Sequence, residues 1–132
     1  CEEVEILKLN KECIRYLLLY IEENAQLNDD TIDVLNIIDS GFSTDDLVYT
    51  AIKLKEAGYI NGLIKFSDDE IECCYISSLT WNGHSFLDNI RDNNVWKTTK
   101  EIVNKFSSVS VSIINSVASQ VILKLIEKQL GQ

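Results

Sequence analysis

The stretch STDDLVYTAIKLKEAGYI, residues 43–60, contains the signals for one complete helix and for the start of the next strand. Ser43 is a favourable N-cap residue, and Asp45 and Asp46 place negative charge at the positive end of the helix dipole. The apolar side consists of Leu47, Ala51 and Leu54, with Val48 and Ile52 beside them. Gly58 falls where a left-handed residue commonly ends a helix. We therefore predict that this helix ends just before Gly58 and packs its apolar side in the core.

Two extended segments follow this helix and predict a β-hairpin. YINGLIKF (59–66) and EIECCYISSL (70–79) are rich in isoleucine, tyrosine, phenylalanine and cysteine, as strands often are. Ser67, Asp68 and Asp69 connect them and suit a tight turn. These acids lack the spacing and the glycine of a calcium-binding loop, so we interpret them as turn residues.

The stretch LTWNGHSFLDNIRDNNVW, residues 79–96, holds the only histidine and both tryptophans of the chain. Thr80 is a suitable N-cap for a helix here. Gly83 would allow another backbone segment to approach closely, which would justify the cost of about 0.5–1 kcal/mol that glycine imposes on a helix. The structural core predicted around this helix consists of Trp81, Phe86, Leu87, Leu54 and Gly58.

His84 is the one candidate for acid–base catalysis. It shares a helical face with Trp81 and Leu87, which favours a structural histidine bonded through one ring nitrogen. Ser85 points about 100° away from it on a helix, so the two do not form a catalytic pair. A phosphate-binding glycine loop and a zinc-type spacing of cysteines are both missing from the sequence. We expect no enzyme, no cofactor and no metal site.

Three further segments complete the pattern. LNKECIRYLLLYIEEN (9–24) has one apolar face and predicts a helix capped by Asn10. TIDVLNII (31–38) suits either a short strand or a short helix. Asp92, Asn93 and Asn94 interrupt the helix that Thr80 opens and can cap another that starts near Val95.

The order of helices and hairpin is similar to a winged helix, the helix-turn-helix variant that carries a β-hairpin wing. The matching positions are Leu54, Gly58 and Ile60 at the start of the wing and Leu79, Thr80, Gly83 and Leu87 at its end. The helix that normally precedes the recognition helix is weak here, with TIDVLNII in its place. We predict an α+β, mainly helical fold: a winged-helix-like domain over residues 8–92 and a C-terminal helical extension over 93–132.

The segments LLLYIEEN, YTAIKLKEAGYING and LTWNGHSFLDNIRDNNVWKTTKEI together resemble a family of uncharacterised small proteins from bacteria and their prophages, catalogued as a domain of unknown function. The resemblance covers roughly residues 8–106, and LTWNGHSFLDNIRD is its most specific motif. It implies an origin in a bacterium or prophage and a fold, but no activity.

The charge distribution argues against a DNA-binding surface. The net charge is −9, and residues 1–50 carry twelve acids against three bases. Proteins that bind DNA usually present a basic face to its phosphates. The candidate nucleic-acid contacts are Lys53, Lys55 and Lys65 together with a stripe formed by Arg91, Lys97, Lys100 and Lys105. The helix of residues 44–57 contains no arginine, the usual reader of guanine.

The last segment, SSVSVSIINSVASQVILKLIEKQL (107–130), predicts a helix that docks or self-associates. It has no charge between Lys105 and Lys124, and its apolar arc is wider than one core requires. The candidate contact residues are Ile114, Val117, Val121 and Leu125. Interrupting serines, an asparagine and a glutamine disfavour a membrane span.

These observations favour a non-enzymatic, phage- or prophage-associated accessory protein that binds a protein partner through its acidic surface or its C-terminal helix. Homo-oligomers through that helix are a further expectation. The alternatives are a DNA-binding transcriptional regulator and an acidic DNA mimic that inhibits a host nucleic-acid enzyme. Because Cys73 and Cys74 are sequence neighbours, a disulfide between them would be strained, and free thiols in a reducing bacterial cytoplasm are expected.

Overall fold

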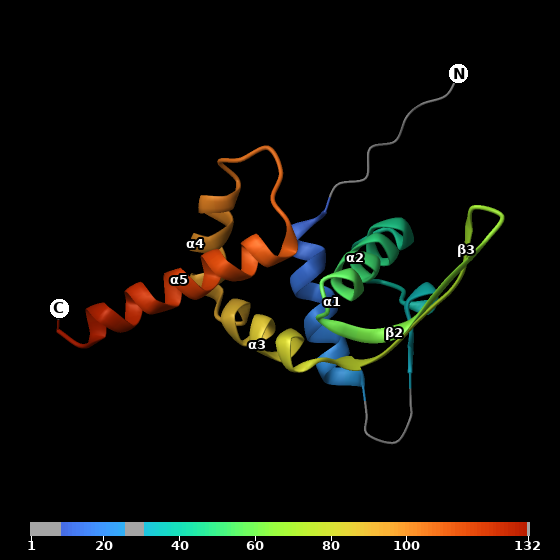
Figure 1. The fold of residues 1–132 in the computed structure, drawn as a ribbon, viewed down its shortest axis with the longest axis horizontal. Coiled ribbons are helices and arrows are strands. Elements are labelled where there is room, and N and C mark those ends of the chain that lie inside the picture. The colour runs from blue at the N-terminus through green and yellow to red at the C-terminus, as the bar shows by residue number, and fades with distance from the viewer. Residues whose placement is uncertain (1–8, 26–30, 132) are drawn as a thin grey trace.

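The protein is an α+β, mainly helical molecule, and the computed structural model describes residues 9–25 and 31–131 (Figure 1). The coarse class predicted from the sequence is therefore confirmed. In chain order the elements are α1 (Lys11–Asn24), β1 (Ile32–Asp33), the 3-10 helix η1 (Val34–Asn36), α2 (Thr44–Glu56), β2 (Ile60–Ser67), β3 (Glu70–Leu79), α3 (Trp81–Ile90), α4 (Asn93–Val103) and α5 (Val111–Gln129).

The sheet is antiparallel and is built around the predicted hairpin. Its strand order is β1-β3-β2, so the hairpin strands pair with each other and the very short β1 pairs with the far edge of β3. Asp68 and Asp69 form the tight turn with φ values of 54° and 69°. Aspartate is one of the few residues that tolerate this left-handed region, and this explains the two acids at the tip.

The predicted helix boundaries follow from their caps. The side chains of Asn10, Ser43 and Thr80 each accept a hydrogen bond from the backbone N–H three residues later. Gly58 has φ of 84°, and its N–H donates to the carbonyl of Lys55, as the predicted end of α2 requires. These local signals therefore fixed where three of the helices begin and where α2 ends.

The segment that suited either a strand or a helix forms both. After the two residues of β1, the carboxylate of Asp33 accepts a hydrogen bond from the N–H of Leu35, and the chain turns into η1. A side chain that bonds to the backbone two residues on competes with continued sheet pairing. The strand therefore stops after Asp33.

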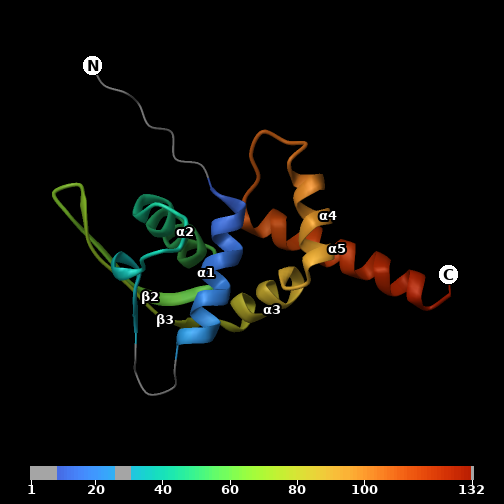
Figure 2. The same cartoon turned by 180° about the vertical axis from the view of Figure 1, so that it is seen from behind.

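The core lies where α1 is surrounded by α2, α3 and the sheet. Figures 1 and 2 show α1 in the centre, with α2 beside the hairpin on one side and α3 on the other. The largest fully buried side chains include Ile14, Leu17, Leu18 and Ile21 of α1, Leu47 and Leu54 of α2, and Phe86, Leu87 and Ile90 of α3. Burial of these aliphatic and aromatic groups supplies most of the driving force for folding.

Trp81 does not belong to this core, so its predicted packing is wrong. Its side chain is 84% exposed. The buried residues of α3 are Gly83, Phe86, Leu87 and Ile90. With about 100° of rotation per residue, their mean direction lies roughly opposite to that of Trp81. His84 is exposed as well, so the buried face that it was predicted to share with Trp81 does not form.

Gly83 makes the close contact that its position in the helix predicted. A β-carbon on Gly83 would overlap the backbone carbonyl oxygen of Tyr59. The same carbonyl accepts a hydrogen bond of 3.0 Å from the N–H of Thr80, and the hydroxyl of Thr80 donates to the carbonyl of Gly58 at 2.7 Å. The start of α3 is thereby fixed against the end of α2 and the start of β2.

We predict that Gly83→Ala destabilises the protein even though alanine is the better helix former. The added methyl group meets backbone atoms that cannot rotate away, so we expect a loss of about 1–3 kcal/mol in the free energy of unfolding. Urea denaturation measures this loss. Asn82→Ala, an exposed change on the same helix, is the control and should cost nothing; equal stability of the two variants would contradict the contact.

We predict opposite outcomes for the two tryptophans. Trp96 is 3% exposed, and its indole N–H donates to the carboxylate of Glu12 at 3.2 Å. Trp96→Ala should therefore cost about 3–5 kcal/mol, whereas Trp81→Ala should change stability by less than about 0.5 kcal/mol. Thermal unfolding of the two variants side by side checks the expectation. A large loss for Trp81→Ala would mean that this indole is buried in solution.

Candidate protein-binding surfaces

Helix α5 starts on the body of the protein and ends away from it. Of the predicted contact residues, Ile114 is fully buried, Val117 and Val121 are half-buried, and Leu125 is 44% exposed. Asn115 ties the first half of α5 to α3 through a 2.8 Å hydrogen bond from Asn89. The predicted contact stripe is therefore divided: its first part packs in the core and its last part reaches solvent.

All residues from Leu123 to Gly131 are exposed, and Figures 1 and 2 show this end of α5 pointing away from the rest of the chain. This projecting end spans roughly 13 Å at 1.5 Å per residue. Its exposed apolar side chains are Leu123, Leu125, Ile126 and Leu130, each at least 44% exposed. Leu123, Ile126 and Leu130 lie outside the predicted stripe. The sequence feature that could have indicated them is the apolar arc, which is wider than one core can cover.

Two shallow grooves run along the contact between α4 and α5. Their volumes are about 380 and 530 Å³, and both are lined by Ile102, Val121 and Lys124. Leu125 and Lys128 extend the second groove onto the projecting end. The two grooves share residues and are together called the α4–α5 groove. This groove and the projecting end form one continuous apolar surface with lysines at its border. Ile102, on α4, was not among the predicted contacts because only the packing of α4 beside α5 brings it there.

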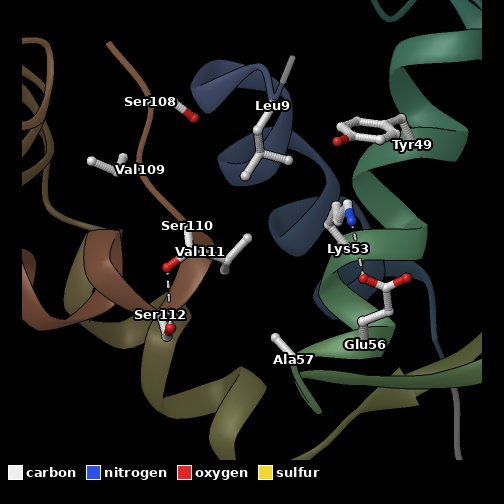
Figure 3. A pocket seen from close by; sticks show the side chains of 10 residues that line it. All are labelled: Leu9, Tyr49, Lys53, Glu56, Ala57, Ser108, Val109, Ser110, Val111 and Ser112. Carbon is white, nitrogen blue, oxygen red and sulfur yellow. Dashed lines mark hydrogen bonds and ion pairs between the residues drawn. The ribbon is translucent and has the colours of Figure 1, made fainter. Parts of the chain in front are cut away.

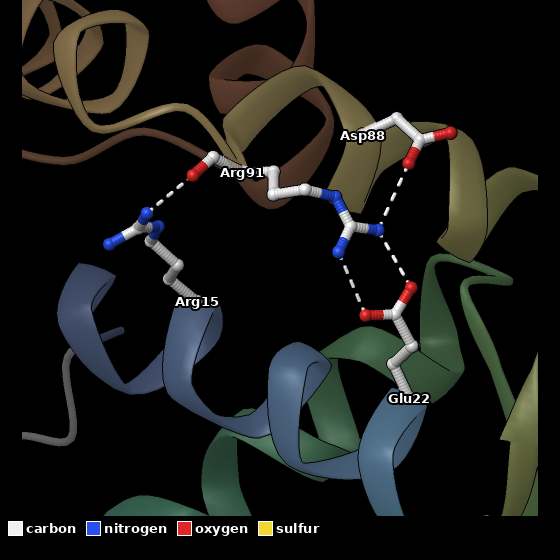
Figure 4. Close-up of polar contacts among 4 residues, drawn as sticks. All are labelled: Arg15, Glu22, Asp88 and Arg91. Carbon is white, nitrogen blue, oxygen red and sulfur yellow. Dashed lines mark hydrogen bonds and ion pairs between the residues drawn. The ribbon is translucent and has the colours of Figure 1, made fainter.

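The predicted basic stripe does not form, because two of its members are paired with acids. The guanidinium of Arg91 contacts both carboxylate oxygens of Glu22 at 2.8 and 2.7 Å and also reaches Asp88 at 3.1 Å (Figure 4). These contacts raise the pKa of Arg91 and lower the pKa of Glu22. Lys100 is paired with Glu12 of α1. Burial alone would raise the pKa of Glu12, but its bonds from Lys100 and Trp96 outweigh burial and lower it.

Arg15 has a structural role next to this ion-pair cluster. Its guanidinium donates to the backbone carbonyls of Ile90 and Arg91 and to the side chain of Asn93. The first two carbonyls lie at the end of α3, where helix carbonyls lack partners in their own helix. Arg15 and Arg91 together therefore join α1 to the corner between α3 and α4 (Figure 4).

The remaining candidate nucleic-acid contacts are dispersed. Lys53 forms an ion pair of 3.1 Å with Glu56, which raises the pKa of Lys53, and it lies over the ring of Tyr49. Lys55, on the same helix, is exposed. The other exposed candidates are Lys65 on β2, Lys97 on α4 and Lys105 after α4. The structure does not bring these lysines together into one basic face.

Another cleft lies between Leu9 near the start of α1, helix α2 and the segment that leads into α5 (Figure 3). Its volume is about 640 Å³, and Lys53 and Glu56 are paired in its wall. Ser110, also in the wall, caps α5 by accepting from the N–H of Ile113. Lys53, Glu56 and Ser110 thus already serve the ion pair and the helix cap.

The described cysteines are free thiols in different surroundings. Cys74 is buried, which raises its pKa to about 11, and burial also raises the pKa of Cys13. Cys73 is half-buried on the neighbouring position of β3. Both buried cysteines are thus held as neutral thiols at pH 7. Within residues 9–25 and 31–131, histidine, cysteine, aspartate and glutamate side chains form no group of three that could hold a metal ion. None of the described helices has the length and hydropathy of a membrane span.

These observations define an α+β, mainly helical protein with an exposed apolar surface on its last helix. The chain matches the family described as "Hypothetical protein (DUF2513)" over residues 8–110 and belongs to that family. It is also 29% identical to an uncharacterised protein of Haemophilus influenzae over 121 residues, which cover 91% of this chain and 99% of that relative. No solved structure gives a significant match.

We predict that the Glu22–Arg91 ion pair contributes a pH-dependent part of the stability. Because the folded state lowers the pKa of Glu22, the contribution is complete above the unfolded pKa of about 4.3 and is lost as the pH falls through the folded pKa. The side chains of Glu22 and Arg91 are 35% and 44% exposed, so solvent limits the contribution of this pair to the free energy of unfolding to about 0.5–1 kcal/mol.

Glu22→Gln should therefore be less stable than the wild type at pH 7 and equal to it once the pH lies below the lowered pKa of Glu22 in the folded state. Denaturation curves at several pH values test this. Glu23→Gln, an exposed change on the same helix, is the matched control and should show no such difference. If the difference in stability between Glu22→Gln and the wild type stayed the same at low pH, the ion pair would not be its cause.

Proposed function

We propose that the protein is a non-enzymatic, winged-helix-like module that binds a protein partner through the projecting end of α5 and the adjoining α4–α5 groove. The observation that carries the proposal is the exposure of Leu123, Leu125 and Ile126, each at least 44% exposed, on the end of α5 beside the α4–α5 groove. A phage or prophage origin and a cytoplasmic location, as expected from the sequence, are parts of this proposal.

A helix end whose apolar side chains face water is only marginally stable. Helices gain most of their stability in proteins from tertiary packing, and the residues after Ile122 are all exposed. Exposed apolar patches bordered by polar residues commonly mark protein interaction sites. Lys124 and Lys128 provide such a border. Docking would bury the apolar side chains and support the last turns of α5 at once.

A second copy of the chain is the most direct partner to test. In a two-fold pairing, each projecting end can lie beside the α4–α5 groove of the other copy, because one surface serves both sides of such an interface. Lys124 and Glu127 give this surface charges of both signs, as a self-complementary contact requires. A different protein could use the same surface as a helix that enters the groove.

The winged-helix-like part of the proposal is supported by the order of elements and by the strand order β1-β3-β2. In that fold α2 would take the place of the recognition helix. DNA binding is disfavoured because Arg91 and Lys100 are neutralised by acids and the other lysines are dispersed. The excess of acids over bases in residues 1–50 makes a DNA mimic the second candidate function, since a mimic needs acidic side chains that are not paired with bases.

A pull-down from bacterial lysate with the full chain as bait, with and without nuclease, separates these functions. A protein partner should be captured equally in both, and capture should be insensitive to salt if apolar contacts dominate. Nucleic-acid enzymes whose capture falls steeply with salt would favour the mimic. Capture that disappears after nuclease treatment would favour a DNA-binding regulator and contradict the proposal.

We predict that Leu125→Asp disrupts association through α5. Burial of a leucine contributes about 1.5–3 kcal/mol, so its loss should weaken self-association or partner capture by roughly tenfold or more. Light scattering after size-exclusion chromatography and the pull-down measure the two cases. Ser107→Asp adds the same charge at an exposed site after α4 and should change neither. A wild type that is monomeric and captures no protein would refute the proposal.

A further inference from the structure

A second groove lies on a different face of the molecule, between α2 and the tip half of the hairpin. Its volume is about 530 Å³, within the range of sites that hold several side chains. Ile52 of α2 and Phe66 and Ile71 of the hairpin give it an apolar floor. Ile52 and Ile71 are half-buried, and Phe66 is 56% exposed. The α2–hairpin groove therefore leaves apolar surface in contact with water.

The border of this groove is acidic. Asp45 comes from the first turn of α2, Asp69 from the hairpin turn and Glu70 from the start of β3. Every ion pair within the described residues involves other acids, namely Glu12, Glu22, Glu56 and Asp88. The three border acids thus have no cation to neutralise them in that part of the chain.

Both walls of the groove are firmly positioned. α2 is buried along Leu47, Ala51 and Leu54. The hairpin is held by antiparallel pairing along its length, and Ile64 and Ile71 pack on the core. Lys65 is the basic residue nearest in sequence to Phe66, but it is not part of the lining and pairs in register with Cys73. The groove can therefore exist before any ligand arrives, which lowers the cost of binding.

We propose that the α2–hairpin groove binds a basic, partly apolar peptide segment of another protein. Lysine or arginine side chains of the segment would pair with Asp45, Asp69 and Glu70, and a large apolar side chain would cover Phe66 and Ile52. The border acids would repel nucleic acid. A surface that only imitates DNA would not require the apolar residues of the groove. This site is separate from α5, so the two proposals succeed or fail independently.

Panning of the full chain against a phage-displayed library of random dodecapeptides tests the inference. Enriched peptides should contain lysine or arginine together with leucine, phenylalanine or tryptophan. Enriched peptides are then synthesised with a fluorescent label, and anisotropy gives their affinities. Amide shifts in heteronuclear NMR spectra should locate the bound peptide at α2 and the hairpin turn. No enrichment, enrichment without basic residues, or shifts confined to α5 would overturn the proposal.

Two triple variants provide the decisive comparison. Asp45→Asn, Asp69→Asn and Glu70→Gln together remove the border charges, and asparagine tolerates the backbone of the turn. We expect this variant to bind roughly tenfold more weakly, because each exposed ion pair contributes modestly. Glu23→Gln, Asp39→Asn and Glu101→Gln give the same net charge at exposed sites elsewhere and should preserve binding. If both triple variants bound the peptide equally weakly, the peptide would be attracted by net charge only, and the proposed site would be wrong.

Phe66→Ser tests the apolar half of the recognition. It should weaken peptide binding while leaving the melting temperature nearly unchanged, because this ring is more than half exposed. Leu125→Asp should leave peptide binding intact. Loss of binding in Leu125→Asp would instead place the peptide on the α5 surface and contradict the inference.

Discussion

The fold depends on one close backbone contact, between Gly83 and the carbonyl of Tyr59. It joins the end of α2, the start of β2 and the first turn of α3 at a single point. Because the carbonyl approaches α3 so closely, the ring of Tyr59 can pack against that of Phe86 at a tilt of 41°, with centroids 5.0 Å apart. The hydroxyl of Tyr59 also accepts a hydrogen bond from Asn115, which extends the same junction to α5. The positions of the hairpin and of the last helix both follow from this contact.

Local signals predicted most of this arrangement from the sequence. Caps, turn residues and Gly58 act within a few residues of themselves, so they could be recognised without knowing the fold. Trp81 was misplaced because helical spacing is compatible with more than one face, and a large indole suggested burial. The spacing of Gly83, Phe86, Leu87 and Ile90 describes the buried face instead. Only the contact with Tyr59, which is distant along the chain, decides between the two faces.

The surfaces were harder to predict than the core, because they depend on tertiary neighbours. The sequence could not show that Glu22 and Glu12 neutralise Arg91 and Lys100 from another helix. That pairing converts an apparent basic stripe into a structural connection between α1 and the C-terminal helices. The apolar end of α5 was partly predicted from its wide arc. The α2–hairpin groove was missed, since its residues come from segments that were each interpreted as structural.

The chain divides into a core held by the Gly83–Tyr59 junction and an exposed end of α5 that projects from it. Native-state hydrogen exchange of the free, full-length chain tests this division most directly. We expect the amides of Thr80 and of residues 86–90 to exchange only by global unfolding, and those after residue 122 to exchange many times faster. Fast exchange at Thr80, or protection of the end of α5 equal to that of α3 in a monomer, would contradict the account.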